Sequence, residues 1–444
     1  MPPTAVSSSV AGTPVTPDFG APDDLTHSLA ALVKGMTGSE ILRIAGEVRK
    51  LAAAGKPICN LTVGDFDPRQ FPVPPELLSA LHEALDAGET NYPPSDGVLV
   101  LREAVAAWAV ESQGVRYPVE SVLIASGVRP LLYAAFKAVV NPGDTVVYGV
   151  PSWNVNHYVW LTGAKGSVLH PSRERGFHPT AEEIAPLLDG ATLLCLCSPA
   201  NPTGTMMEPA ELAKIAELVV AENERRAAAG GRALFLLWDQ VYGSLVFGGE
   251  HANPVHLVPA SAPWVIALDG ASKAFAATGL RVGWSFAAPA VTARMRDFLG
   301  HVGAWAPRPE QIATAKFIRN PAAIAAFREK MDAGIRARLE ALHQGFQELR
   351  AQGYPVDCVH PQGAIYLSLR LDLIGGTVGG KRIATNDEIR ALLLEQAGLA
   401  VVPFQAFGLK EDTGWFRLSV GAVSMRDIED AWPRIRAMLD SIDN

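Results

Sequence analysis

The chain has 444 residues, of which 48% are hydrophobic and 19% are charged, so it can bury a large core and exceeds the usual size of one domain. Its 38 basic and 46 acidic residues give a net charge of −8 without a dense basic segment, which argues against nucleic acid as a partner. No apolar stretch is as long as a membrane span, so no membrane partner is expected.

Residues 1–24 are rich in proline, serine, threonine and alanine. They lack the basic and apolar regions of a secretory signal, so we expect a disordered tail or an arm that packs on a partner subunit. The four cysteines have no metal-type spacing, and no metal site is expected; they are Cys59, Cys195, Cys197 and Cys358. Small buried thiols in this number fit a reduced, cytoplasmic setting.

The first half of the chain alternates between two patterns. A helical pattern from residue 38 ends at Gly55-Lys56-Pro57, and further amphipathic segments cover 74–87, 98–112, 130–140 and 209–229. Short apolar runs predict strands over 58–63, 121–125, 145–148, 191–197, 233–238, 264–268 and 282–286. Continuous apolar strands between helices predict an α/β fold with a mostly parallel sheet and helices on both faces.

The second half looks like a smaller α+β domain. A helical tract runs from 311 to 352 with a break at Asn320-Pro321, and strands at 364–371 and 415–420 flank a helix at 386–397 before a last helix. We therefore predict a tail over 1–24, the N-terminal part of the small domain over 25–74, a large domain over 75–310 and the C-terminal part of the small domain over 311–444.

Lys273 stands just after the apolar run at 264–268, and Arg281 follows eight residues later in a Gly-rich turn. A lysine held at a strand end beside a second cation should be easier to deprotonate than a free lysine, as imine chemistry requires. A solvated lysine is the ordinary alternative, so this pattern depends on what else the chain supplies.

Polar groups also follow other predicted strands, where ligands of open α/β sheets bind. Asn201 lies in an Asn-Pro-Thr-Gly loop, and Asp239 is followed by Tyr242 three residues on. The backbone of Ser126-Gly127-Val128 at a helix start favours a phosphate, and Trp153 could stack on an aromatic ring. Each also has an ordinary explanation, namely a connecting loop, a helix N-cap or core packing. Together they favour one shared ligand.

With these segments in this order, the chain resembles the class I/II aminotransferases, pyridoxal-phosphate-dependent enzymes of fold type I that include aspartate aminotransferase. The resemblance covers about Ser39 to Asp440. It implies the large pyridoxal-phosphate-binding domain and smaller domain of that fold. It also implies a transferase that moves the α-amino group of an L-amino acid, aspartate-like or aromatic, to a 2-oxo acid such as 2-oxoglutarate. A cytoplasmic homodimer with composite active sites is implied as well.

The resemblance also implies site residues, carried over one by one. Lys273 corresponds to the Schiff-base lysine, Asp239 to the partner of the pyridine nitrogen, and Tyr242 and Asn201 to partners of the ring hydroxyl oxygen. For the phosphate it implies Arg281, the backbone of Gly127 and Val128, and Tyr92 reaching over from the neighbouring subunit. The remaining assignments are Trp153 for ring stacking, Gly64 near the substrate and Arg417 for the substrate α-carboxylate.

Two segments differ from the family pattern. Many members carry a phosphate-binding serine three residues before the lysine, where this chain has Gly270, so Ser272, Ser126 or Arg129 is expected to supply that bond. The entrance segment Asp65-Phe66-Asp67-Pro68 also differs from the commoner order Glu-Pro-Asp-Phe.

Other functions share part of this pattern. Lyases, decarboxylases and cyclopropane-forming synthases of the same fold would use the same cofactor residues. Regulators that fuse the fold to a helix-turn-helix domain would need more than the short N-terminal tail. Donor preference stays open: a distal carboxylate would need a second cation, for which His301, Arg308 and Arg129 are candidates, whereas an apolar pocket could use Trp305, Tyr158, Trp160, Phe404 and Phe407.

Overall fold

The computed structural model describes residues 16–20 and 25–442 and divides the chain into two units, Met1–Gly38 and Ser39–Asn444. The described part of the first unit holds a 3-10 helix at Thr26–Ser28 and the short helix α1 at Ala31–Lys34. The tail or arm expected over 1–24 lies outside the described residues except for 16–20. Everything below concerns the second unit.

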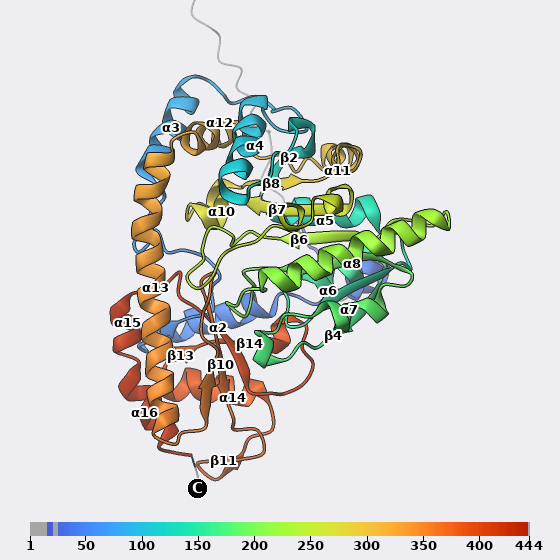
Figure 1. Cartoon of the computed structure of the whole chain (residues 1–444). Helices are drawn as coiled ribbons and strands as arrows, with labels where there is room; N and C mark the ends of the chain where they lie inside the picture. Colours follow the sequence, from blue (N-terminus) through green and yellow to red (C-terminus); the bar gives the residue numbers. More distant parts are fainter. Residues whose placement is uncertain (1–15, 21–24, 443–444) are drawn as a thin grey trace, which may run out of the picture. The chain divides into compact units, whose positions relative to one another are not determined.

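A seven-stranded sheet forms the centre of the second unit (Figure 1). Its strands, in spatial order, are β2 (Val122–Ser126), β8 (Val282–Phe286), β7 (Val265–Gly270), β6 (Phe235–Asp239), β5 (Ala191–Cys197), β3 (Thr145–Gly149) and β4 (Lys165–Leu169). All neighbours run parallel except β8, which is antiparallel to both β2 and β7. The predicted, mostly parallel sheet is confirmed.

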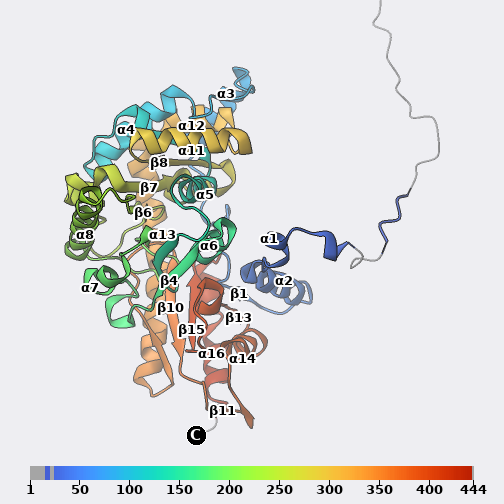
Figure 2. The ribbon, with the colours of Figure 1, turned by 90° about the vertical axis from the view of Figure 1, so that its right-hand side faces the viewer.

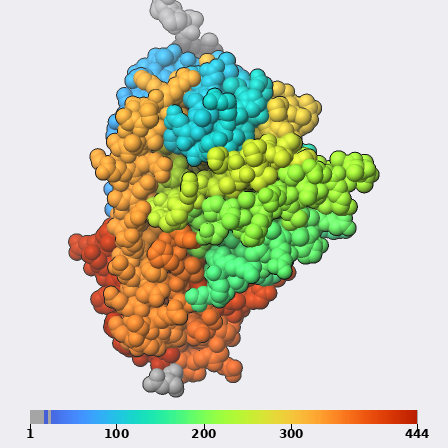
Figure 3. All heavy atoms as spheres, viewed as in Figure 1, coloured from blue at the N-terminus to red at the C-terminus, as the bar shows by residue number. Residues whose placement is uncertain are grey.

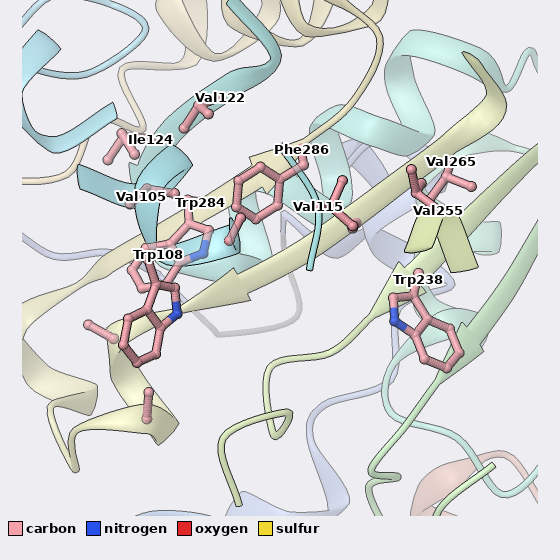
Figure 4. Packing of buried hydrophobic residues seen from close by; sticks show 14 of the residues in the cluster. Val105, Trp108, Val115, Val122, Ile124, Trp238, Val255, Val265, Trp284 and Phe286 are labelled. Carbon is pink, nitrogen blue, oxygen red and sulfur yellow. The ribbon is translucent and has the colours of Figure 1, made fainter. Parts of the chain in front are cut away.

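Helices cover both faces of this sheet. On one face pack α4 (Leu99–Gln113), α8 (Pro209–Ala228) and α12 (Arg308–Ile318), and on the other α5 (Val128–Val139), α6 (Val155–Thr162) and α11 (Pro289–Val302). Successive residues of β7 alternate between the two cores: Val265 and Ala267 face the first, Ile266 and Leu268 the second. This two-sided burial is why the strands read as continuous apolar runs. Cross-strand contacts of the first core are visible in Figure 4, where Trp284 and Phe286 of β8 lie near Ile124 and Val122.

A second, antiparallel sheet belongs to the α+β part. Its order is β14 (Val402–Pro403), β15 (Trp415–Ser419), β10 (Tyr366–Leu371) and β9 (Val356–Cys358), and the parallel pair β1 (Cys59–Asn60) and β13 (Leu399–Ala400) stands apart from it. One face of β10 and β15 packs into a hydrophobic core with α13 (Pro321–Ala351), α15 (Met425–Glu429) and α16 (Trp432–Leu439). Helix α2 (Glu40–Ala53) packs beside β13 and β14 (Figure 2).

Helix α13 extends from the hydrophobic core on one face of the large sheet to the core of the antiparallel sheet. It begins where the sequence predicts a break: the Asn320 side chain accepts a hydrogen bond from the Ala323 amide at 3.1 Å, and Pro321 occupies the first helical position. From there it runs along the chain's second unit as a continuous strip of atoms (orange in Figure 3), past α3 (Pro75–Asp86) and α12 to the α+β part. The proposed domain limits near residues 74 and 310 stay predictions.

The remaining elements are short. They are α7 (Ala181–Ile184), α9 (Pro254–Leu257), α10 (Ala271–Ala274), α14 (Asn386–Leu392), a π-helical turn at Leu393–Ala397, and the hairpin strands β11 (Thr377–Val378) and β12 (Lys381–Arg382). Short 3-10 helices lie at Val119–Ser121, Arg173–Arg175, Ala185–Leu187, Pro259–Trp264, Thr278–Leu280 and Phe404–Phe407. None of the helices in the described ranges has the length and apolarity needed to cross a membrane. All four cysteines are free.

Candidate active site

A cavity of about 580 Å³ opens beyond the carboxyl ends of the parallel strands. Twelve of the candidate site residues from the sequence line it: Gly64, Val128, Arg129, Trp153, Tyr158, Asn201, Asp239, Tyr242, Ser272, Lys273, Arg281 and Arg417. They come from both sheets. The large sheet contributes residues at or just after the ends of β2, β3, β5, β6 and β7, and the antiparallel sheet contributes Arg417 from β15. The structure therefore brings together residues that lie up to several hundred positions apart in the chain.

Lys273 lies in α10, directly after β7, and its ammonium group donates a hydrogen bond of 2.5 Å to the carbonyl oxygen of Gly64. The Nζ atom also lies 5.5 Å from the ring centre of Phe66 and 5.9 Å from that of Tyr242. This apolar and aromatic surrounding removes water from the amine. Burial is the main cause that lowers the pKa of Lys273 from an ordinary 10.5 to about 8.

Charges near Lys273 act on the same pKa in both directions. The Asp65 carboxylate raises it, whereas the guanidinium groups of Arg417, Arg129 and Arg281 lower it. The sequence pattern predicts easier deprotonation from the position of Lys273 at a strand end and from the neighbouring cation Arg281. The structure shows that burial lowers the pKa of Lys273 most, and that the three cations lower it further. At pH 7 a pKa near 8 leaves about a tenth of the amine unprotonated and able to act as a nucleophile or base, against well under a hundredth for a pKa of 10.5.

Asp239 ends β6, and its Oδ1 atom accepts a hydrogen bond from the Val241 amide at 3.1 Å. Burial raises the pKa of this carboxyl from 3.8 to about 6, while the Val241 amide lowers it. A carboxylate in such a site is favoured by a cation placed next to it, because the cation restores the charged form. A protonated ring nitrogen in the cavity would be such a cation.

Arg417 is the most confined charged group of the site. Its side chain is 1% exposed and donates hydrogen bonds to Asn201 Oδ1 at 3.1 Å and to the Thr62 carbonyl oxygen at 2.6 Å. The guanidinium lies over two aromatic rings, with Cζ 4.7 Å from the ring centre of Tyr366 and 4.8 Å from that of Phe407. Among the described residues its Nε atom has no hydrogen-bond partner. A planar, fixed guanidinium of this kind suits bidentate recognition of a carboxylate.

Arg281 defines the other end of the cavity. It follows Thr278–Leu280 with a left-handed backbone (φ 57°) and donates to the Thr278 carbonyl at 2.7 Å and the Ser126 carbonyl at 3.1 Å. Gly127 precedes α5, whose first amides have no acceptor within the helix. A Cβ atom on Gly127 would lie 2.4 Å from Arg281 Nη2, so glycine is needed for this approach. Ser126 and Gly127 thus adjoin the cavity beside Arg281.

Trp153 and Arg129 meet on one wall. The guanidinium carbon of Arg129 lies 5.1 Å from the Trp153 ring centre, and both residues line the cavity. Within the described part of the chain Arg129 forms no ion pair. The other two candidate cations differ from it: Arg308 is paired with Glu89, and neither Arg308 nor His301 is part of the cavity lining.

The five residues considered for an apolar pocket do not lie together in the structure. Tyr158 lines the cavity; Phe404 and Phe407 are buried in the core beside it, Trp160 is exposed, and Trp305 packs edge-on against Tyr92 with ring centres 5.4 Å apart. Tyr92 itself is 82% exposed and lies outside the cavity lining of its own chain.

Several lining residues were not singled out from the sequence. Tyr366 and Cys197 contribute side chains from strands, and Ile41, Leu42 and Ala45 contribute one face of α2. Asp65, noted only as part of an unusual entrance segment, accepts a hydrogen bond from Thr278 Oγ1 at 2.5 Å. The strand position of Tyr366 was predicted, but no local signal tells which face of an isolated strand points to a ligand.

Comparison with known proteins identifies the family. A family model described as "Aminotransferase class I and II" matches residues 56–435. The chain belongs to the class I and II aminotransferases. The aspartate aminotransferase of Rhizobium meliloti is 27% identical over 93% of this chain and 96% of its own length. The aspartate/prephenate aminotransferase of Cereibacter sphaeroides is 29% identical, with 90% and 95% covered.

Solved structures agree with this assignment. The aspartate aminotransferase of Thermus thermophilus with maleate superposes with a TM-score of 0.82 at 27% identity, covering 92% of this chain and 99% of that one. The fold type I architecture and a transferase activity are thereby confirmed, and aminotransferases of this family depend on pyridoxal phosphate. The cavity fits that group: it offers a partly buried lysine, a carboxyl that favours a neighbouring cation, and an arginine beside the amides that begin α5.

Proposed function

We propose that this aminotransferase uses Lys273 as both the imine-forming amine and the proton carrier, Asp239 to hold the ring nitrogen protonated, and Arg417 to bind the substrate α-carboxylate. The observation that supports the proposal is that these three groups line one cavity with matching environments. When bound, pyridoxal phosphate supplies the electron sink that makes the α-proton acidic. All other tasks fall to side chains and backbone of the chain.

The role proposed for each side chain follows from its charge. Lys273 has a pKa near 8, so its amine can take up the α-proton and return it. The negative charge of Asp239 acts on the ring nitrogen without further rearrangement, as preorganised electrostatic groups do. Arg417, held in contact with two rings, fixes the carboxylate and so decides which bond at the α-carbon faces Lys273. Tyr242 and Asn201 would bond the ring oxygen, with Trp153 stacked on the ring.

At the phosphate end, we propose Arg281, Ser272, Ser126 and the amides of Gly127 and Val128 as ligands. Gly270 leaves no hydroxyl at the position where many family members have one. Tyr92 is proposed to complete the phosphate site of a neighbouring subunit, since its side chain is 82% exposed in its own chain. A homodimer with composite sites follows from this assignment, and a cytoplasmic location fits the four free cysteines.

For the amino donor we propose an aspartate-like amino acid whose distal carboxylate is bound by Arg129. Arg129 is the one candidate cation that lines the cavity, and no carboxylate within the described residues neutralises it. The Rhizobium meliloti relative is named an aspartate aminotransferase, and the Thermus thermophilus structure contains maleate, a dicarboxylate. Both names fit a second cation in the site.

Aromatic donors are a second candidate, because part of the cavity lining is apolar. Ile41 and Leu42 of α2 and Leu132 and Tyr158 belong to this part. Leu42 is 70% exposed, so a substrate ring could cover it. One relative is named an aspartate/prephenate aminotransferase, which fits acceptance of more than one side chain.

A panel of amino donors with 2-oxoglutarate tests both proposals. For Arg129→Gln we expect kcat/KM with aspartate to fall roughly 10- to 100-fold, as expected for one charge-assisted hydrogen bond, while phenylalanine and alanine keep their values. Arg308→Gln is the matched control, since it removes an arginine outside the cavity. An equal loss for all donors, together with weaker cofactor binding, would instead assign Arg129 to the phosphate. Release of a product without stoichiometric amino transfer would indicate a lyase or decarboxylase.

A further inference from the structure

Tyr366 is a cavity residue with no role so far. It begins β10 and pairs with Ser419 of β15, and β-strand alternation puts its side chain on the same face as Ser368, which pairs with Arg417. The side chain is 1% exposed and lines the cavity. Its hydroxyl hydrogen-bonds the Tyr242 hydroxyl, with the two rings edge-on and 5.4 Å apart.

We propose that Tyr366 is a positioning residue that couples the two ends of the reaction site. Its hydroxyl holds and polarises the Tyr242 hydroxyl, and its ring supports the Arg417 guanidinium. This inference rests on the proposed function, because it presupposes that Tyr242 serves the cofactor ring and Arg417 the substrate.

The number of protons on each hydroxyl decides which tyrosine donates in the Tyr242–Tyr366 hydrogen bond. A tyrosine hydroxyl has a single proton and can accept as well as donate. When Tyr242 donates its proton to the ring oxygen, it can only accept toward Tyr366, so Tyr366 is the donor. A hydrogen bond accepted by a hydroxyl strengthens the bond that this hydroxyl donates. Tyr366 thereby makes Tyr242 a better donor to the ring oxygen.

The second contact concerns the substrate arginine. The Arg417 Cζ atom lies 4.7 Å from the Tyr366 ring centre and 4.8 Å from that of Phe407, so both rings contact the guanidinium. Cation–π contacts are strongest where water is excluded, and both partners are 1% exposed. These ring contacts set the plane of the guanidinium, while Asn201 and the Thr62 carbonyl set its rotation within that plane.

Gly64 shows that the Tyr366 hydroxyl occupies a tightly defined place. A Cβ atom on Gly64 would lie 2.7 Å from that hydroxyl but 3.5 Å or more from the next atoms, Arg417 Nη1 and Tyr366 Cζ. The Gly64 carbonyl in turn accepts the hydrogen bond of Lys273. The hydroxyl of Tyr366 therefore accounts for the requirement for glycine beside the catalytic lysine.

Three variants of the cofactor-loaded enzyme test the proposal. Tyr366→Phe removes only the hydroxyl. We expect it to raise the pH midpoint of the visible absorbance change by about half to one pH unit, because a weaker donor stabilises the anionic ring oxygen less. The KM for the amino donor should stay within about twofold of wild type, because the ring remains under Arg417. Tyr366→Leu removes the ring as well and should raise that KM roughly tenfold.

Tyr117→Phe is the matched control, because Tyr117 stacks on Phe286 outside the cavity. A midpoint for Tyr366→Phe equal to that of wild type and the control would overturn the first contact. An unchanged KM in Tyr366→Leu would overturn the second. Failure of the proposed function itself would look different, since wild type would then show no cofactor band or no amino transfer.

A paired substitution gives an independent test. Gly64→Ala should weaken cofactor binding through the clash with the Tyr366 hydroxyl, and Tyr366→Phe in the same chain should restore most of it. Circular dichroism confirms that each variant is folded. If the double variant binds pyridoxal phosphate no better than Gly64→Ala alone, the hydroxyl is not what excludes a side chain at position 64, and the proposed packing is wrong.

Discussion

Replacement of Lys273 by methionine would measure how strongly the site disfavours a buried ammonium group. In the folded chain the pKa of Lys273 is lowered from 10.5 to about 8, chiefly by burial. At 1.36 kcal/mol per pH unit, the charged form is therefore disfavoured by about 3 kcal/mol. The hydrogen bond to Gly64 is lost in the variant and offsets about 1 kcal/mol. We expect Lys273→Met to raise the free energy of unfolding of the cofactor-free enzyme by about 2 kcal/mol at pH 7.

The pH dependence follows from the direction of the pKa change. Between about pH 8 and 10.5 the unfolded chain keeps a proton on Lys273 that the folded chain has released, so wild-type stability rises with pH in this window. Below pH 8 the penalty is complete, and above 10.5 it is absent. The advantage of the methionine variant should accordingly shrink as the pH rises and reverse slightly by the upper limit, where only the loss of the hydrogen bond to Gly64 remains.

Urea unfolding of both proteins without cofactor, at equal protein concentration and at pH 7, 9 and 10.5, provides the measurement. Lys137→Met is the control, because Lys137 is an exposed lysine on α5 and should give a small difference at every pH. A difference for Lys273→Met that is independent of pH would refute the reasoning. So would a variant that is less stable than wild type at pH 7.

Three further substitutions have defined outcomes. Asp239→Asn should lower kcat at least about 100-fold while the cofactor stays bound, because it removes the charge that keeps the ring nitrogen protonated; steady-state rates and the absorbance spectrum check this. Arg417→Ala should raise the KM for the amino donor and leave the cofactor band intact, and loss of the band would show that another arginine binds the α-carboxylate. Gly270→Ala should cost about 1 to 3 kcal/mol in urea unfolding, because a Cβ there would lie 3.0 Å from the Gly283 backbone, whereas Gly279→Ala, with nothing within 4 Å, should be nearly neutral.

The parts of the site that could be predicted from the sequence share one property. Asp239 is the last residue of a buried strand, Asn201 and Lys273 stand within four residues after two others, and the carboxyl ends of parallel strands meet at one edge of a sheet. Local pattern and sheet geometry were therefore enough to group them. The strands Ala191–Cys197 and Val282–Phe286 have the predicted bounds for the same reason, since both faces are buried and the apolar run equals the strand.

Other elements could not be predicted because their residues carry no comparable signal. β4 is an edge strand whose residues are mostly exposed, so Lys165–Leu169 does not form an apolar run. Helix α11 was also absent from the sequence-based expectation, and its charged residues Arg294, Arg296 and Asp297 mask the buried stripe. The contribution of α2 to the cavity depends on how β13 and β14 fold beneath it, which is a tertiary effect.

The phosphate end shows how a departure in sequence can be compensated by packing. Gly270 lacks the expected hydroxyl, but its small size allows close packing, since a Cβ there would lie 3.0 Å from the Cα of Gly283; a Cβ on Gly283 would in turn lie 2.5 Å from the carbonyl carbon of Gly127. This contact presses β8 against the start of α5 and leaves Arg281 close enough to donate to the Ser126 carbonyl. The start of α5 and the Arg281 guanidinium thus lie together at the end of the cavity that we propose for the phosphate, where many family members add a serine side chain. Glycines contribute to this site by leaving room for backbone groups rather than by supplying polar side chains. A search for polar residues alone would therefore underestimate the capacity of the site to bind an anion.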